Sequence, residues 1–299
     1  MGKKEKIEEL KHEENAVILG HNYQREEVQK IADFLGDSLG LSKQAAKTEA
    51  DTIIFCGVKF MAETAKILSP DKQVLLPERD SDCPMANMIT PEEIAKMKED
   101  HPNAKVVSYV NTTAEVKAVS DVCCTSSNAI DVVKNLNAKK VIFTPDKNLG
   151  SWVQRFVDKE MVIWDGHCYV HNHITPAEVK KSKENMPEAT LIVHPECKPE
   201  VADLADEVGS TGDMVDYAKR PDVDKMIIGT EMGLIKRLQR EHPEKEFYSA
   251  GSPKICQGMK KITIDSVYEA LKNNRYEIEL ENKVKEGAKK ALDKMLKYS

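Results

Sequence analysis

Three cysteines in this sequence share one local pattern, in which isoleucine lies six residues after the cysteine and threonine seven. The segments are CPMANMIT (83–90), CYVHNHIT (168–175) and CQGMKKIT (256–263), and their cysteines lie 85 and 88 residues apart. Three matches at nearly even spacing indicate an internal repeat. Three thiolates from distant loops fit one iron–sulfur cluster in which one iron has no protein ligand. Such an iron can act as a Lewis acid, as the metal of an open zinc site does.

The segment DGHCYVHNHIT (165–175) also admits a different metal site. Cys168, His171 and His173 lie within six positions, which is a spacing seen in zinc sites. Only one thiol is local, however, and no C-x-x-C pair accompanies it. We therefore group Cys168 with Cys83 and Cys256, and keep a structural zinc protein as an alternative.

The composition narrows the class of protein. The chain has 299 residues and a net charge of -6, so nucleic acid is not an expected partner. No apolar stretch of about 18 residues predicts a membrane span, and MGKKEKIEEL (1–10) has no signal-peptide core. Seven cysteines without a secretion signal favour reduced thiols and a cytoplasmic location. Cys56 and Cys197 are expected to be buried packing residues, and the role of Cys123 and Cys124 is left open.

The repeat extends to the elements that would position the cysteines. TPEE (90–93) and TPAE (175–178) are typical helix starts, with threonine as N-cap and proline at the first helical position. Each helix leads into a short apolar run typical of a buried parallel strand, and further strands and helices alternate after it. The first such runs are AVILGHNY (16–23), AKVVSYVN (104–111) and ATLIVHPE (189–196).

This order predicts three similar small three-layer parallel α/β domains related by a pseudo-threefold axis, with the active site at their common interface. The expected limits are 1–88 with the N-terminal helix, 89–173 and 174–265, followed by a C-terminal helical segment at 266–299. A single sheet of nine to twelve strands is the competing architecture. The helices at 4–14 and about 280–297 are expected to lie outside the repeat and to pack near each other.

Polar residues follow the predicted strands, where parallel sheets bind ligands. The first strands end in His21-Asn22-Tyr23, Tyr109-Val110-Asn111 and His194-Pro195-Glu196. Hydroxyl-rich segments precede later helices at Asp37-Ser38, Thr125-Ser126-Ser127 and Ser210-Thr211-Gly212. These hydroxyls could simply cap helices, but three at equivalent positions favour a pocket for a ligand with several anionic groups.

Taken together, these motifs resemble the quinolinate synthase family, the A proteins of NAD biosynthesis. The resemblance covers nearly the whole chain and rests on GHNYQ (20–24), ADFLGDS (32–38), CPMAN (83–87), YVNTT (109–113), CTSSNA (124–129), DGHCYVH (165–171), VHPEC (193–197), VGSTG (208–212) and IGTEMG (228–233). The family fold is three α/β domains around a pseudo-threefold axis. The resemblance implies condensation of iminoaspartate with dihydroxyacetone phosphate to quinolinate, phosphate and water, with a [4Fe-4S] cluster on Cys83, Cys168 and Cys256.

The resemblance also implies roles for other residues. Tyr23 and Glu196 would be acid–base residues, and His21 and Tyr109 would act beside them. Asn111, His171 and His194 would line the substrate, with His171 close to the cluster. Ser38, Ser126, Ser210 and Thr211 would hold carboxylate or phosphate. The enzyme that supplies iminoaspartate is a conceivable partner.

Two further alternatives stay open at this point. A different [4Fe-4S] hydro-lyase would use the same open iron on another polycarboxylate. An iron–sulfur sensor or electron-transfer module would show a reversible redox couple and would not need Tyr23 or Glu196. Some relatives carry a C-terminal C-x-x-C-x-x-C, whereas this chain has only Cys256 there, followed by GMKK.

Overall fold

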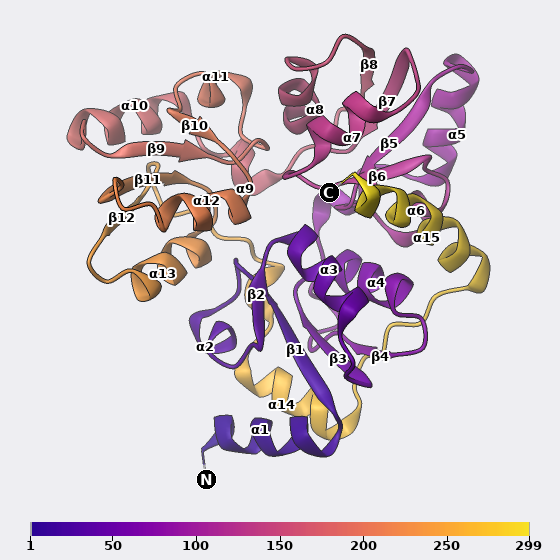
Figure 1. The fold of residues 1–299 in the computed structure, drawn as a ribbon, viewed down its shortest axis with the longest axis vertical. Coiled ribbons are helices and arrows are strands. Elements are labelled where there is room, and N and C mark those ends of the chain that lie inside the picture. Colours follow the sequence, from indigo (N-terminus) through magenta and orange to yellow (C-terminus); the bar gives the residue numbers. More distant parts are fainter. Residues whose placement is uncertain (1, 299) are drawn as a thin grey trace.

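The strands of the chain form three separate sheets in a computed structural model, which describes residues 2–298 (Figure 1). Each sheet has four strands, all parallel, in the order second, first, third, fourth. The strands are β1 (Ala16–His21), β2 (Phe34–Gly36), β3 (Thr52–Cys56) and β4 (Gln73–Leu75); β5 (Lys105–Tyr109), β6 (Val122–Cys124), β7 (Lys140–Thr144) and β8 (Glu160–Ile163); β9 (Thr190–Val193), β10 (Glu207–Val208), β11 (Lys225–Gly229) and β12 (Glu246–Ser249). One topology repeated three times confirms the predicted fold class and excludes a single large sheet.

Helices connect successive strands and cover the sheets (Figure 1). They are α1 (Lys3–Glu13), α2 (Glu26–Gln29), α3 (Ser38–Lys47), α4 (Lys59–Leu68), α5 (Pro91–Asp100), α6 (Ala114–Ala118), α7 (Ala129–Asn135), α8 (Lys147–Gln154), α9 (Tyr169–Asn172), α10 (Pro176–Asn185), α11 (Pro199–Ala202), α12 (Thr211–Ala218), α13 (Met232–Glu241), α14 (Ile264–Asn273) and α15 (Asn282–Lys297). Two short 3₁₀ helices, η1 (Pro84–Asn87) and η2 (Met259–Lys261), follow Cys83 and Cys256. The three sheets surround a common centre (Figure 1). The residue limits predicted for the three domains stay a prediction.

The central strands are buried along nearly their whole length. Every residue of β3 is buried, and in β7 only Lys140 is partly exposed. A strand covered on both faces by helices needs a continuous apolar run, which is how the sequence identified these segments. The second strand of each repeat has only two or three residues, too few to give a pattern, and was not identified.

The threonines of the repeated motif begin helices as predicted. Thr90 and Thr175 each accept a hydrogen bond from the backbone N–H of a glutamate three residues later, whose carboxylate bonds back to the threonine N–H. Thr263 caps α14 in the same way with Ser266. All three occurrences of the motif therefore place a cysteine seven residues before a capped helix.

The expected pairing of the N-terminal and last helices is wrong. Helix α1 packs against α14 and β1, whereas α15 packs against α6 and β6 in the second repeat (Figure 1). Buried residues of α15 recur at helical spacing, at Ala288, Ala291, Leu292 and Met295, so the helix needs an apolar surface. Gly287 allows close approach, since a Cβ there would lie 2.8 Å from the Ala118 carbonyl oxygen. Helix α14 contacts α2 and β3 of the first sheet as α10 contacts α11 and β11 of the third, so α14 rather than α1 takes the helix position that follows the repeated motif. That α1 lies outside the repeat stays a prediction.

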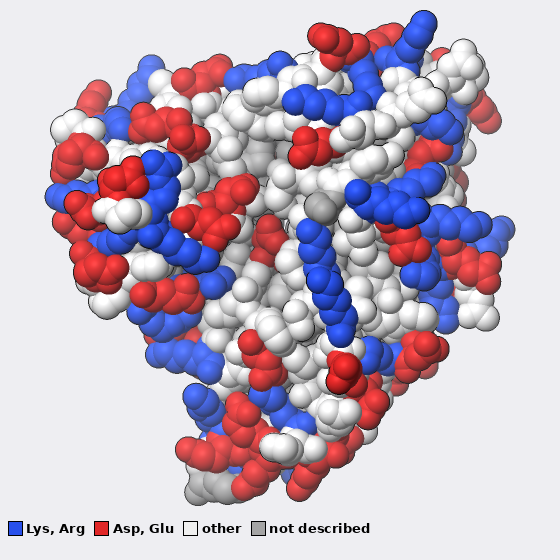
Figure 2. All heavy atoms as spheres, viewed as in Figure 1, with Lys and Arg blue, Asp and Glu red and all other residues white. Residues whose placement is uncertain are grey.

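The surface carries both signs of charge. Figure 2 shows lysine and arginine side chains intermixed with acidic ones around the face in view. Among residues 2–298, no helix has both the length and the apolar character needed to cross a membrane.

Candidate active site

The carboxyl ends of the strands meet around one small cavity of about 60 Å³ that all three repeats line. Every residue predicted for the site lines it except Ser210. The predicted residues in its wall are His21, Tyr23, Ser38, Cys83, Tyr109, Asn111, Ser126, Cys168, His171, His194, Glu196, Thr211 and Cys256. Phe60, Met61, Val170 and Met259 supply apolar wall. Residues separated by more than 200 positions in sequence are thus brought together, as the symmetry argument requires.

The predicted hydroxyl residues differ in their surroundings. Ser210 is fully buried and caps α12, with its hydroxyl 2.7 Å from the Asp213 carboxylate. Thr211 beside it lines the cavity and accepts a hydrogen bond from Asn22. Ser126 lies in the turn before α7, which begins at Ala129 rather than at the hydroxyl segment. The structure therefore gives Ser210 a helix-capping contact and leaves Ser38, Ser126 and Thr211 facing the cavity.

The three repeat cysteines form a plausible metal-ligand set. All three are free thiols, partly buried, in the wall of the same cavity. Burial raises the pKa of Cys83 to about 12, with the nearby Cys256 adding to the effect, and burial likewise raises the pKa of Cys168 and of Cys256. Soft thiolate donors from three loops fit an iron–sulfur cluster, and ligation would require these thiols to lose their protons. Cys56, Cys123, Cys124 and Cys197 are buried in the core, as expected for the first and last of them.

His171 connects Cys168 to Glu196 and Tyr23. Its Nδ1 lies 2.6 Å from Glu196 Oε2 and 3.3 Å from Cys168 Sγ. Its Nε2 lies 2.8 Å from Thr230 Oγ1 and 3.3 Å from the Tyr23 hydroxyl. Cys168, His171 and Glu196 could together hold a metal ion, but His173 is exposed and outside this group. The local zinc site of Cys168, His171 and His173 is therefore not formed.

Glu196 is a buried carboxylate with one oxygen engaged. Oε2 contacts His171, whereas Oε1 has no hydrogen-bond partner among the described residues. Burial is the largest single influence and would raise the pKa of Glu196, but His171, His194 and the Tyr109 hydroxyl together outweigh burial and hold that pKa below its ordinary value. A buried oxygen without a partner is costly, so Oε1 is available to a ligand or a proton.

His21 and His194 have matching geometry in the first and third repeats. The backbone N–H two residues later donates to Nδ1 in each, from Tyr23 at 3.1 Å and from Glu196 at 3.2 Å. This bond assigns the single ring proton to Nε2, since Nδ1 acts as an acceptor. Burial, with Lys260 near one ring and His171 near the other, lowers the pKa of both to about 3. Both rings are therefore neutral donors at neutral pH.

These neutral histidines make stability depend on pH in a definite direction. Their folded-state pKa lies below the unfolded value, so the unfolded chain binds more protons below pH 6.5. The free energy of unfolding should fall as pH drops from about 6.5 toward 3. In urea unfolding of the cluster-free chain, His194→Gln should reduce this slope by about 1 kcal/mol per pH unit. His12→Gln, at an exposed position, is the control, and an unchanged slope in His194→Gln would contradict neutral burial.

The two tyrosines of the cavity are uncharged donors. Burial, followed by the nearby Glu196 charge, raises the pKa of Tyr23 and of Tyr109 well above the ordinary value. The Tyr23 hydroxyl lies 2.6 Å from Thr230 Oγ1. Asn111 Oδ1 is buried without a hydrogen-bond partner among the described residues and lines the same cavity. The site thus combines neutral donors, the Glu196 carboxylate and an available amide oxygen.

Sequence reasoning missed several residues of the site. Thr230 follows β11, the third strand of its repeat, and bridges Tyr23 and His171. The rule that ligands bind beyond strand ends could have found it, had it been applied to the third strands. Asp37 lines the cavity, and its carboxylate lies 3.4 Å from the Ser127 hydroxyl and 3.5 Å from that of Ser210. From the sequence, Asp37 is included only as a neighbour of Ser38 and is not predicted to line the site.

Gly258 allows two cysteine loops to pack closely. A Cβ at this position would lie 2.1 Å from the Asp82 carbonyl oxygen, which is a severe clash with backbone. Gly258→Ala should therefore separate the Cys83 and Cys256 loops and lower the free energy of unfolding by about 1–3 kcal/mol. Urea unfolding of the cluster-free chain measures this. Gly36→Ala, whose Cβ would meet nothing closer than 3.6 Å, is the matched control. Equal effects of the two substitutions would argue against close packing of the loops.

Comparisons with known proteins agree with this geometry. The family model described as Quinolinate synthetase A protein matches residues 5–297. A quinolinate synthase of Caldicellulosiruptor saccharolyticus is 53% identical over 297 residues, covering 99% of this chain and 98% of the relative. Those of Alkaliphilus metalliredigens and Methanosarcina barkeri are each 51% identical, covering 98% of this chain and 97% and 96% of the relatives. The chain therefore belongs to the quinolinate synthetase A protein family.

Proposed function

We propose that this chain is a quinolinate synthase of NAD biosynthesis, which condenses iminoaspartate with dihydroxyacetone phosphate to quinolinate, phosphate and water. The observation that carries the proposal is the convergence of Cys83, Cys168 and Cys256 on one cavity together with buried acid–base residues. Relatives with this name, about half identical to the chain over nearly its whole length, support it. A cytoplasmic location and a supplying enzyme as partner stay predictions.

The proposed cofactor is a [4Fe-4S] cluster on the three repeat cysteines. Three protein thiolates leave one iron without a protein ligand, and when bound the cluster supplies a Lewis acid that polarises a substrate oxygen. The donor set supports this choice, because three of the seven cysteines line the cavity as free thiols and the others are fully buried elsewhere. The local zinc site of Cys168, His171 and His173 is disfavoured, because His173 is exposed.

Glu196 and Tyr23 are proposed to move protons. Glu196 is ionised at neutral pH and keeps Oε1 available, so it can take a proton from substrate. His171 stabilises that carboxylate from the other side through its 2.6 Å contact. Tyr23 keeps its proton, and its hydroxyl is linked to His171 through Thr230. Tyr23 can therefore donate a hydrogen bond or a proton to a developing oxyanion.

The remaining cavity residues are proposed to bind and orient substrates. His21 and His194 present Nε2–H groups from opposite repeats, while Tyr109 adds a hydroxyl and Asn111 an amide. Ser38, Ser126 and Thr211 add hydroxyls suited to carboxylate or phosphate oxygens. Iminoaspartate carries a carboxylate at each end and dihydroxyacetone phosphate carries one phosphate, so the two substrates together present three anionic groups to a cavity lined by donors from three domains.

The direct test is anaerobic. The purified chain is reconstituted with iron and sulfide and supplied with iminoaspartate and dihydroxyacetone phosphate, and quinolinate is quantified with and without the cluster. Quinolinate formed only by the cluster-loaded protein supports both activity and cofactor. A stable cluster with no quinolinate would favour the other hydro-lyase, and a colourless protein with stoichiometric zinc would overturn the cofactor assignment.

A further inference from the structure

Each of the three repeat cysteines donates its backbone N–H to a carboxylate. The pairs, cysteine first, are Cys83 with Asp82 Oδ1 at 2.8 Å, Cys168 with Asp146 Oδ2 at 2.7 Å and Cys256 with Glu231 Oε1 at 3.1 Å. Charge-assisted hydrogen bonds of this kind are stronger than bonds between neutral groups. The same interaction at all three cysteines indicates a shared requirement of the cysteine loops.

Asp146 and Glu231 hold equivalent positions in the second and third repeats. Each is fully buried and caps the helix that follows the third strand. Asp146 Oδ1 accepts from two backbone N–H groups of α8, and Glu231 Oε2 accepts from Gly233 in α13. In both residues one carboxylate oxygen thus serves the helix while the other serves the cysteine loop.

Helix capping alone does not account for these acids. Serine or threonine caps a helix with one oxygen, as Ser210 does in α12. A buried carboxylate is more costly to desolvate than a hydroxyl, and its second oxygen is the part that reaches the cysteine. In the first repeat Val58 occupies the capping position, and Asp82, adjacent to Cys83, provides the acceptor instead. The cysteine N–H therefore still donates to a carboxylate in the first repeat, although that carboxylate comes from a different position in the sequence.

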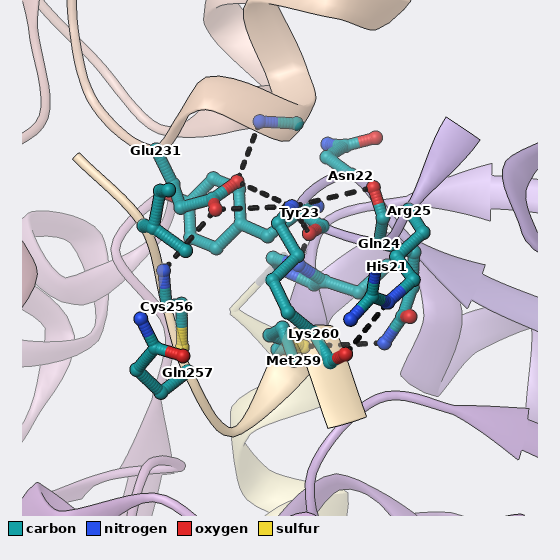
Figure 3. Close-up of polar contacts among 12 residues, drawn as sticks. His21, Asn22, Tyr23, Gln24, Arg25, Glu231, Cys256, Gln257, Met259 and Lys260 are labelled. Atoms are coloured by element: carbon teal, nitrogen blue, oxygen red, sulfur yellow. Dashed lines mark hydrogen bonds and ion pairs between the residues drawn. The ribbon is translucent and has the colours of Figure 1, made fainter. Parts of the chain in front are cut away.

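Glu231 also ties the Cys256 loop to the first repeat. Lys260 Nζ lies 3.0 Å from Glu231 Oε1 and contacts the Tyr23 backbone carbonyl. In Figure 3, dashed lines join the Glu231 carboxylate to the Cys256 backbone and to the Lys260 ammonium, which also contacts the backbone of Tyr23. The segment that carries Cys256 has little regular structure, so these contacts fix its position relative to two domains.

We propose that Asp146 and Glu231 are positioning residues that hold the Cys168 and Cys256 loops where both sulfurs reach one cluster. This inference rests on the proposed cluster. Neither carboxylate ligates a metal in this scheme. Each orients a ligand by holding the backbone beside it, as groups behind a ligand commonly do.

The test uses isosteric amide variants of the full chain. Asp146→Asn and Glu231→Gln keep one acceptor oxygen but turn the other into an NH₂ group, so the side chain can accept from the helix or from the cysteine N–H but not from both. Each should lose its cluster to a chelator about 10- to 100-fold faster than the parent. The paramagnetic resonance spectrum of the reduced cluster should also change, which a loss of overall stability would not cause.

The chain supplies matched controls in Asp121 and Asp206. Each accepts a backbone N–H near the start of a central strand and pairs with a lysine, away from the cavity. Asp121→Asn and Asp206→Asn should retain the cluster and its spectrum as the parent does. Asp146→Ser is a second variant that keeps a good helix cap while removing the contact to Cys168, so a folding defect at the cap can be separated from loop positioning.

The outcomes distinguish the inference from the proposed function. Faster cluster loss in Asp146→Ser, Asp146→Asn and Glu231→Gln, but not in the controls, supports positioning. Parent-like loss rates and spectra in these variants overturn it, even if the parent holds a cluster and makes quinolinate. A parent chain that binds no cluster under reconstitution would instead defeat the cofactor assignment on which both depend.

Discussion

Cys168→Ser is expected to abolish quinolinate formation and cluster binding together. A serine hydroxyl is a poor ligand for iron, and two remaining thiolates hold a cluster far less well than three. Lewis-acid assistance is worth several kcal/mol, so the loss of activity should be about 1,000-fold or more. The measurements are iron and sulfide per chain, the visible absorption of the cluster, and quinolinate formed anaerobically.

Cys197→Ser is the matched control for this prediction. Cys197 is buried in the third repeat outside the cavity wall, with its Sγ 3.5 Å from the Gly229 carbonyl oxygen, which can accept a bond from the new hydroxyl. It should keep both cluster and activity. A Cys168→Ser protein that retains full turnover would show that Cys168 is not a ligand, whatever the behaviour of the control.

Glu196→Gln is expected to separate catalysis from cofactor binding. The amide has nearly the shape of the carboxylate but cannot take up a proton, and Glu196 reaches Cys168 only indirectly, through His171. The variant should therefore hold a normal cluster while quinolinate formation falls about 10²- to 10⁴-fold, the usual contribution of a general acid–base group. Cluster content and turnover are measured on the same preparation.

Glu196→Asp refines this test. It keeps a carboxylate but withdraws it by one methylene from His171, which now lies 2.6 Å away. Activity between that of the parent and that of Glu196→Gln would support proton transfer as the role of the residue. Normal turnover in Glu196→Gln would show that the acid–base role is wrong and would leave Tyr23 as the principal candidate.

The sequence predicted the repeated topology because its signals are strong and local. Buried parallel strands such as β3 and β7 are continuous apolar runs, and Thr90 and Thr175 begin helices through contacts within four residues. The rule that ligands bind beyond the carboxyl ends of parallel strands then predicted most cavity residues, since it needs only the order of strands and helices.

Other features depend on contacts between distant segments, which one sequence does not encode locally. The final helix has an apolar stripe, but nothing in that stripe specifies α6 and β6 rather than α1 as its partner. The contact of Glu231 with the Cys256 N–H likewise joins residues 25 positions apart through a loop without regular structure. Ser210 is a different case. A serine at the start of a helix gives the same sequence pattern whether its hydroxyl binds a ligand or only caps the helix, as it does in α12.

The three strand ends that surround the cavity carry different side chains at equivalent positions. His21 and Tyr109 end β1 and β5, and His194 directly follows β9. Two residues after each of them come Tyr23, Asn111 and Glu196. A homotrimer of identical subunits would have to present three copies of one such pair, and could not give an asymmetric ligand a different set of contacts from each subunit sequence. Joining the repeats in one chain lets each repeat diverge, so Glu196 can lie beside the neutral imidazole of its own repeat while the other two repeats place Tyr23 and Asn111 at the equivalent position. An asymmetric pair of reactants can then be held in one orientation inside a nearly symmetric scaffold.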